Sequence, residues 1–234
     1  MKKICFVLTI LVVMFQCSNI VLANSFDDTV GIGNSFSKAI DILQEKNIIE
    51  GFPDGTFRPN DHITRAEFAA LLYRYTFNDN HSDDMSYYEF GDVDKTHWAY
   101  PYINTMFNEG IMYGIGNNLF APETNLTFEQ ALMMILRTND KKYMCFANSY
   151  NHPMGYLVDA DNLGLMNGFD YYWADPRYTP WTSVDDKNNK VLSYENEQGE
   201  KAELPTLDEL KPDFMETYIT RKEVCLLLYN LMGK

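Results

Sequence analysis

The feature that most constrains the fold is an internal repeat. Residues 39–72 align without a gap on residues 102–135, at a constant offset of 63 positions. A third copy is split, with its first half at residues 156–169 and its second half at residues 219–232. Each copy alone has too little apolar surface to fold, so such units stack and share a core. We therefore expect three related units around one core.

Each copy predicts two helices joined by a tight loop. Apolar residues at positions 36, 39, 40 and 43 follow helical spacing, and so do those at positions 99, 102, 103, 106 and 107. A glycine often follows a helix directly, so these first helices are expected to end near Gly51, Gly114 and Gly168. A loop, in which Phe57 is expected to point inward, leads to the second helix. The predicted fold class is mainly α.

The copies also set the expected domain boundaries. Repeat one is placed at residues 24–77, repeat two at 88–139 and repeat three at 146–234. Repeat three carries an insertion at residues 170–217, which is expected to be irregular or to form a small β-hairpin. Turn residues around Gln198 and Gly199 favour the hairpin.

The N-terminus has the pattern of a secretory signal peptide over residues 1–23. Lys2 and Lys3 precede an apolar run that ends at Phe15, and small or apolar residues lead up to an expected cleavage after Ala23. The run is too short to span a bilayer, and no later segment approaches the roughly 18 apolar residues that a span needs. The mature protein is therefore expected to be exported, with no membrane span.

The charge and the cysteines narrow the function further. The chain has 33 acidic and 19 basic residues, a formal net charge of -14, which disfavours nucleic acid and anionic membranes as partners. Once the signal peptide is removed, Cys145 and Cys225 are left. Either a disulfide between them or two buried free thiols would fit an exported protein.

The second helix of each copy begins with a capping signal. Thr64 with Glu67 and Thr220 with Glu223 have the spacing of a capping box, which satisfies two backbone N–H groups and typically contributes about 1 kcal/mol. In repeat two the pattern is weaker, with glutamine as the second residue: Thr127 and Gln130.

An arginine directly follows two of these threonines. Arg65 and Arg221 would stand in the first turn of a helix, where a cation opposes the helix dipole by about 0.3 to 1 kcal/mol. Two explanations are open. Each arginine could form a salt bridge with a neighbouring repeat, or it could hold an external anion together with the helix N-terminus. In repeat two this position is Phe128.

The segments GFPDGTFRPNDHITRAEFAALL (residues 51–72) and GDVDKTHWAYPYI (residues 91–103) resemble the S-layer homology repeat. The resemblance covers nearly all of the mature chain, with a good first copy, a degenerate second copy and an interrupted third copy. It implies three helix-loop-helix repeats in a pseudo-threefold prism that shares a central helical bundle. In that family, grooves between the repeats bind secondary cell-wall polymer, often a pyruvylated glycan, and so tether exported proteins to the bacterial surface.

The resemblance also implies which residues bind the polymer: Arg65, Arg221, Trp98, Gly51, Gly114 and Gly168. Trp98 could offer its face to a sugar ring, or it could be wedged in the shared core. Two departures reduce the number of complete grooves. Phe128 replaces the motif arginine of repeat two, and Ser35 replaces the tryptophan of repeat one.

These observations predict a non-enzymatic, secreted module of the cell wall or S-layer of a Gram-positive bacterium, whose partner is a cell-wall polysaccharide. The alternative is a surface module with degenerate grooves, whose insertion contacts another surface protein. Close carboxylate pairs in so acidic a chain are usually solvated rather than catalytic. The four histidines lack the spacing of metal ligands, and no cofactor or metal is expected.

Overall fold

The computed structural model describes residues 26–78, 88–139, 154–169, 182–184, 190–192 and 213–233. This part is mainly helical, as predicted. Its elements are η1 (Asp27–Thr29), α2 (Asn34–Glu45), α3 (Arg65–Phe77), α4 (Tyr100–Asn108), α5 (Phe128–Asn139), α6 (Met154–Asn162), β1 (Thr182–Val184), β2 (Lys190–Leu192), η4 (Asp213–Glu216) and α8 (Arg221–Met232). The predicted signal peptide lies outside the described residues.

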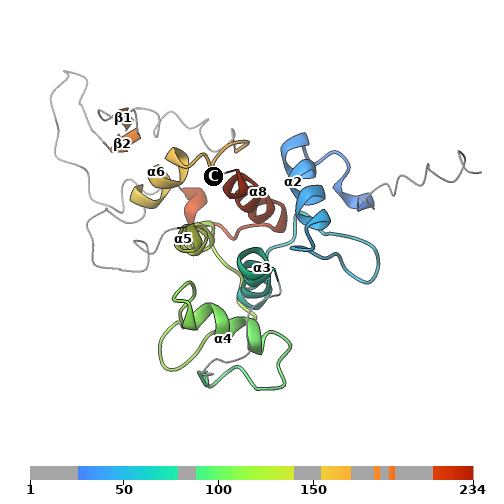
Figure 1. Ribbon diagram of the computed structural model, residues 1–234, viewed down its shortest axis with the longest axis vertical. Helices are drawn as coiled ribbons and strands as arrows, with labels where there is room; N and C mark the ends of the chain where they lie inside the picture. Colours follow the sequence, from blue (N-terminus) through green and yellow to red (C-terminus); the bar gives the residue numbers. More distant parts are fainter. Residues whose placement is uncertain are drawn as a thin grey trace, which may run out of the picture.

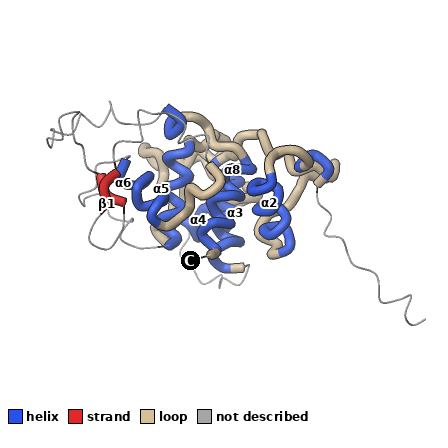
Figure 2. Tube along the Cα trace, turned by 90° about the horizontal axis from the view of Figure 1, so that it is seen from above, coloured by secondary structure: helices blue, strands red, loops and turns tan. Residues whose placement is uncertain are grey.

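The helices form an inner and an outer set. The second helices of the three copies, α3, α5 and α8, gather at the centre, and the first helices, α2, α4 and α6, lie around them (Figure 1). Each outer helix packs against the inner helix of another copy: α4 against α3, α6 against α5 and α2 against α8. Figure 2, at right angles, shows the helices side by side from α5 to α2. The copies therefore close into a ring.

A cycle of backbone hydrogen bonds closes the same ring. The N–H of Leu126 donates to the carbonyl of Ile63 at 3.1 Å, and the N–H of Ile219 donates to the carbonyl of Leu126 at 3.0 Å. The N–H of Ile63 completes the cycle to the carbonyl of Ile219 at 3.4 Å. These residues occupy the same position in the three copies, one residue before the capping threonine, and all three are buried. Each copy is thus joined to both others where its inner helix begins.

One core runs through all three copies. The outer helix α2 buries Phe36, Ala39, Ile40 and Leu43, which share one face because of their spacing. The loop residue Phe57 is 1% exposed, and Phe120, its counterpart 63 positions later, is 0% exposed. The inward position predicted for Phe57 is confirmed. Burying a side chain of this size contributes about 1.5 to 3 kcal/mol.

The prediction that the first helices end at glycine is wrong. They end at Glu45, Asn108 and Asn162, six residues before Gly51, Gly114 and Gly168. The left-handed residues beyond these ends are Asn47, Gly110 and Gly164, with φ of 56°, 71° and 70°. The later glycines stand in the loop instead.

Gly114 is needed because another part of the chain passes too close for a side chain. A Cβ there would lie 2.6 Å from the carbonyl oxygen of Leu119 and 2.9 Å from the ring of Phe90. Gly51 has the same surroundings in repeat one, where a Cβ would meet Phe26 and, at 2.8 Å, the carbonyl oxygen of Thr56. Both glycines thus allow close packing of the loop.

We predict that Gly114→Ala lowers the free energy of unfolding by about 1 to 3 kcal/mol, since a backbone carbonyl must move to admit the methyl group. Gly91→Ala is the matched control in the same repeat, because its Cβ would have its nearest neighbour at 3.6 Å. That change should stay within about 0.5 kcal/mol. Urea unfolding measures both, and equal midpoints for the two variants would contradict the packing argument.

The described part of the insertion contains one pair of antiparallel strands, β1 and β2, with Ser183 opposite Val191. The hairpin predicted around Gln198 and Gly199 lies outside the described residues.

Candidate functional site

Arg65 points into the protein. Its side chain is 5% exposed; Nε donates to the carbonyl of Phe120 at 2.8 Å and Nη2 donates to the carbonyl of Tyr113 at 2.7 Å. The guanidinium also lies over the Phe120 ring, 4.6 Å from its centre. Burial lowers the pKa of Arg65 to about 10, and the charge of Asp92 acts in the opposite direction. The group therefore stays charged at neutral pH and ties α3 to the loop of repeat two.

Arg221 makes the equivalent contacts one interface away. Its Nε donates to the carbonyl of Phe57 at 2.9 Å, and Nη2 lies 3.5 Å from the carbonyl oxygen of Glu50. Phe57 and Glu50 are the repeat-one counterparts of Phe120 and Tyr113. Arg221 also forms a salt bridge, with Nη1 3.5 Å from Oε1 of Glu67. The salt bridge to a neighbouring repeat, one of the two explanations for the motif arginine, is thus present here.

The capping residues hold both arginines at the start of their helices. Thr64 N–H donates to the Glu67 carboxylate at 2.8 Å, and Thr220 N–H donates to the Glu223 carboxylate at 2.8 Å. In α5 the corresponding bonds, between Thr127 and Gln130, are both 3.3 Å long. The backbone N–H of Arg65 and that of Arg221 donate to the carbonyls of Thr124 and Asp61, so each helix N-terminus is already bonded to a neighbouring loop.

A cleft of about 260 Å³ opens beside Arg221, where the three repeats meet. It is lined by Ile48, Ile49, Glu50, Gly51, Phe52, Phe57, Ile63, Glu67, Ala70, Leu71, Arg74, Trp98 and Arg221. We call it the Arg221 cleft. Three of the predicted polymer-binding residues therefore come together here: Arg221, Gly51 and Trp98.

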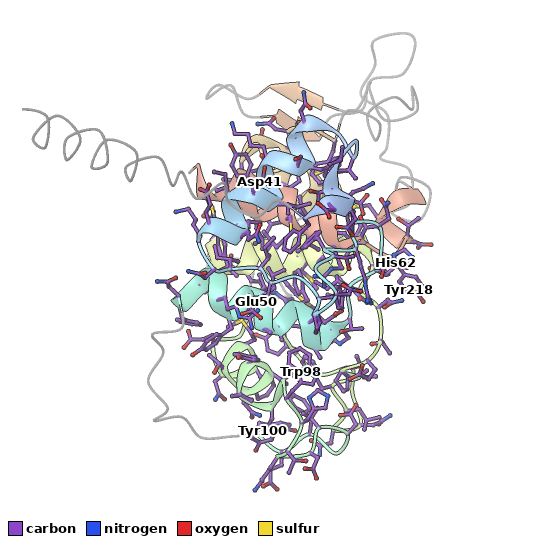
Figure 3. All side chains as sticks on the ribbon, turned by 90° about the vertical axis from the view of Figure 1, so that its right-hand side faces the viewer. Asp41, Glu50, His62, Trp98, Tyr100 and Tyr218 are labelled. Carbon is purple, nitrogen blue, oxygen red and sulfur yellow. The ribbon has the colours of Figure 1, made fainter. Side chains whose placement is uncertain are left out.

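Trp98 is the aromatic wall of the Arg221 cleft. Its side chain is 54% exposed, which excludes the alternative that it is wedged in the core. Its ring stacks beside His97 at 5.9 Å and lies 6.4 Å from Tyr102. Figure 3 shows Trp98 where α3 and α4 meet, on the same face as Glu50. An exposed indole held between neighbouring rings can receive the apolar face of a sugar.

The charges of the cleft are paired loosely. Arg74 Nη2 lies 3.7 Å from Glu50 Oε1, a carboxylate whose side chain is 72% exposed. The pair of Arg221 and Glu67 is also long, at 3.5 Å. The Glu50 carboxylate is exposed, and such a surface pair contributes about 0 to 1 kcal/mol, so an arriving anion can displace Glu50 from Arg74 at little cost. The side chains of Arg221 and Glu67 are only 12% and 30% exposed, so Arg221 is held more firmly at the wall of the cleft.

Glu50, Glu67 and Arg74 line the cleft but were not predicted to do so. Glu67, Ala70, Leu71 and Arg74 follow helical spacing, so one face of α3 carries all four. That spacing is a signal for Glu67 and Arg74, although it does not tell which loop the face meets, and no such signal marks Glu50.

The equivalent position beside Arg65 is filled by larger side chains. Met133 stands where the Arg221 cleft has Ala70, and Arg137 stands where it has Arg74. Arg137 is 2% exposed; it donates to the carbonyl of Ile111 at 3.1 Å and lies 5.1 Å from the ring centre of Tyr113. Its Nη2 is 3.2 Å from the Met133 sulfur. Arg65 and Arg137 therefore both contact Tyr113, Arg65 at its carbonyl and Arg137 at its ring.

The third interface has an aromatic pair in place of the arginine. Phe128 is fully buried and packs edge-to-face on Phe169, with ring centres 5.7 Å apart. Gly168, with φ of +87°, lies beside Ser35 and Leu226 at this interface, and Gly114 lies in the loop that Arg65 holds. The structure therefore does not bring these two glycines into the Arg221 cleft.

The remaining candidate features are the cysteines, a possible metal site and a possible membrane span. Cys225 is a free, fully buried thiol whose pKa is raised to about 12 by burial, and Cys145 lies outside the described residues. Within the described ranges, no group of three His, Cys, Asp or Glu side chains could hold a metal ion. In the same part of the chain, no helix is both long and apolar enough to cross a membrane.

Comparison with known proteins bears on this arrangement. The chain is 31% identical over 138 residues to a cell surface protein of Thermoanaerobacter kivui, an alignment that covers 58% of this chain and 17% of that protein. It is 32% identical over 110 residues to a cellulosome-anchoring protein of Acetivibrio thermocellus, covering 44% and 23%. It is 36% identical over 107 residues to endo-1,4-beta-xylanase A of Thermoanaerobacterium saccharolyticum, covering 45% and 9%.

The chain thus spans less than a quarter of each of these relatives. A family model for the S-layer homology domain matches residues 25–69 and 89–132. These two stretches contain α2 with the loop that follows it and the start of α3, and α4 with its own loop and the start of α5. The chain thus carries two stretches of S-layer homology sequence.

Proposed function

We propose that this protein attaches non-covalently to the bacterial cell wall by binding a secondary cell-wall polymer in the Arg221 cleft. The bound group would be an acidic sugar, and we expect it to be part of a pyruvylated glycan. The protein would then be an exported component of the cell wall or S-layer of a Gram-positive bacterium. It would act by binding, without catalysis.

The observation that carries this proposal is the meeting of Trp98, Arg74 and Arg221 in one cleft. An exposed aromatic face and two guanidinium groups, of which that of Arg74 is loosely paired, suit a ligand that has both a sugar ring and an acid group. Gly51 lets the loop pass closely at the edge of this cleft. Charge-assisted bonds to such an acid contribute about 1.5 to 3 kcal/mol each.

The names of the relatives support the same reading. A surface protein, an anchoring protein and a xylanase share with this chain only a small part of their length. Two of these names, those of the cell surface protein and the cellulosome-anchoring protein, refer to the cell surface or to anchoring. We propose that the part they share with this chain attaches it to the cell.

A sedimentation assay with purified cell walls tests the proposal. The protein should sediment with walls of the bacterium that makes it, and chemical removal of the wall polymer should abolish sedimentation. Trp98→Ala should weaken binding about five- to tenfold, the loss expected for an interface residue worth roughly 1 to 1.4 kcal/mol.

Tyr218→Ala is the matched control, because Tyr218 is an aromatic residue of equal exposure, 54%, that lies outside the Arg221 cleft. It should bind as the wild-type protein does. Sedimentation that survives both polymer removal and Trp98→Ala would overturn the proposal and favour a protein partner at the cell surface.

A further inference from the structure

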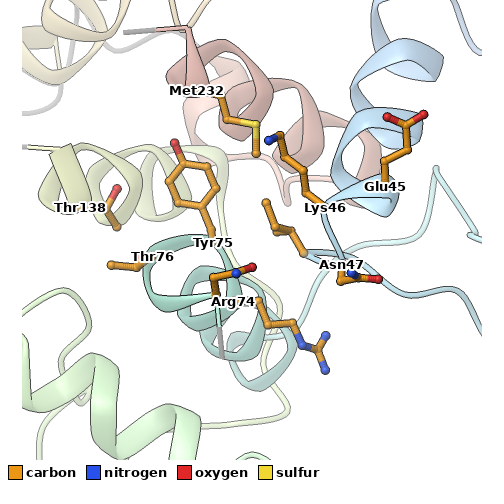
Figure 4. A pocket seen from close by; sticks show the side chains of 10 residues that line it. Glu45, Lys46, Asn47, Arg74, Tyr75, Thr76, Thr138 and Met232 are labelled. Carbon is orange, nitrogen blue, oxygen red and sulfur yellow. The ribbon is translucent and has the colours of Figure 1, made fainter. Parts of the chain in front are cut away.

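A second and larger cleft lies next to the Arg221 cleft. It has a volume of about 820 Å³ and opens where α2 and α3 end. We call it the helix-end cleft. Figure 4 shows Tyr75 and Met232 on one side of it and Lys46 facing them. The lining is polar: besides Lys46 and Tyr75, it includes Asn47, Thr76 and Asn78.

The two clefts adjoin at Arg74. Arg74 and Ile48 line both of them, and Ile48 is buried, so the arginine side chain is the exposed group that the two clefts share. In the other two repeats the corresponding residues are bonded to their own loops: Arg137 to the carbonyl of Ile111 and Asn230 to that of Leu165. Arg74 instead lies 3.7 Å from the exposed carboxylate of Glu50.

Size argues that a ligand uses both clefts. Pockets that enclose a ligand usually measure about 300 to 1,000 Å³. The Arg221 cleft, at about 260 Å³, is smaller than this range, whereas the helix-end cleft falls well inside it. A chain molecule bound only at Arg221 would therefore leave most of its surface in water.

The chemistry of the helix-end cleft differs from that of the Arg221 cleft. Lys46 and Arg74 are opposed by Glu45 and by the partial negative charge at the C-terminal ends of the helices. The remaining groups are amides, hydroxyls and the Tyr75 phenol, whose pKa is raised by burial and which therefore stays a hydrogen-bond donor. This set suits the hydroxyl and acetamido groups of uncharged sugars.

We infer that the polymer chain continues from the Arg221 cleft past Arg74 into the helix-end cleft, with its acidic sugar at Arg221 and neighbouring neutral sugars at the helix ends. The inference rests on the proposed function and extends it, since it assigns the ligand a direction and a length. A polymer of several units should then bind more tightly than a single unit.

Fragments of the wall polymer test this inference. Polysaccharide released from the walls of the bacterium that makes the protein is fractionated into single repeating units and fragments of several units. Calorimetry then measures the binding of each fraction to the full chain. The wild-type protein should bind the long fragments at least about tenfold more tightly, as one further charge-assisted contact would provide.

Thr76→Trp should remove this advantage, because Thr76 is exposed on α3 and a large ring there occupies the helix-end cleft. Lys46→Ala should reduce it. Both variants should bind single units as the wild-type protein does. Lys38→Trp, at an exposed position of α2 outside both clefts, is the control for adding a large ring and should keep the advantage.

Equal affinity of the wild-type protein for short and long fragments, or a full length advantage in Thr76→Trp, would overturn the inference and leave the proposed function standing. Failure of the wild-type protein to bind any fragment would overturn the proposed function itself, and the inference with it.

Discussion

Replacing Arg65 by alanine is expected to lower the free energy of unfolding by about 3 to 5 kcal/mol. The guanidinium is buried and donates two short hydrogen bonds to the carbonyls of Phe120 and Tyr113. A hydrogen bond to a charged group contributes about 1.5 to 3 kcal/mol, and its loss here also leaves carbonyl oxygens with fewer partners. Since these bonds join repeat one to repeat two, their loss weakens the ring of repeats.

Urea unfolding followed by circular dichroism measures this effect. Arg65→Lys should fall between the wild-type protein and Arg65→Ala, because lysine keeps the charge but lacks the planar fork that reaches two carbonyls at once. Arg58→Ala is a control with a far smaller effect, since the Arg58 side chain is 44% exposed. If Arg65→Ala unfolded at the wild-type midpoint, Arg65 would have no structural role.

A variant that removes so much stability cannot also serve as a clean test of binding. The polymer-binding role that the family resemblance implies for Arg65 therefore stays a prediction. In this structure the guanidinium of Arg65 is buried. Because Arg65 is only 5% exposed, an anion could reach its guanidinium only if neighbouring side chains moved aside. The Arg221 cleft can be tested without such a change.

Ala70→Met is expected to weaken wall-polymer binding by about tenfold or more, equal to at least roughly 1.4 kcal/mol of binding free energy. Ala70 lines the Arg221 cleft, and its counterpart in repeat two is Met133, at the place where the equivalent position is filled. A methionine at position 70 would fill the cleft with flexible apolar atoms in the same way. The contacts of Arg221 with Phe57 and Glu67 need not change.

Two measurements make this prediction specific. Ala70 is 3% exposed at the wall of the cleft, so the unfolding midpoint of Ala70→Met is measured beside its affinity, and a variant that stays folded while binding is lost supports the prediction. Ala70→Ser adds only a hydroxyl and should keep wild-type affinity. Wild-type affinity in a folded Ala70→Met variant would show that the polymer binds elsewhere.

Much of the secondary structure was predictable because its signals are local. The spacing of Ile40 and Leu43 on α2, and of Thr64 and Glu67 at the start of α3, depends only on the geometry of a helix. The helix ends were not predictable in this way. Gly51 is required because Phe26 packs against it, and α2 has already ended before this glycine. A contact between residues that are far apart in the sequence cannot be recognised from a short segment of it.

The candidate site was predictable in part. The motif arginines stand out because a cation opposes the dipole at a helix N-terminus, and the exposed position of Trp98 was one of two possibilities that its sequence context allowed. The partners of Arg65 and Arg221 could not be inferred in the same way. We expected a carboxylate or an external anion; Arg221 does pair with Glu67, but both guanidinium groups also bind backbone carbonyls of the neighbouring repeat, which we did not expect.

The sequence by itself determined that the chain forms repeated pairs of helices, since spacing, capping and repetition act within each copy. Tertiary structure alone decided which of two equal motif arginines lies beside an open cleft. That choice depends on the volumes of the side chains that meet there, Ala70 in one case and Met133 with Arg137 in the other. These volumes affect the cleft only after the three repeats have packed together, because the residues concerned are far apart in the sequence.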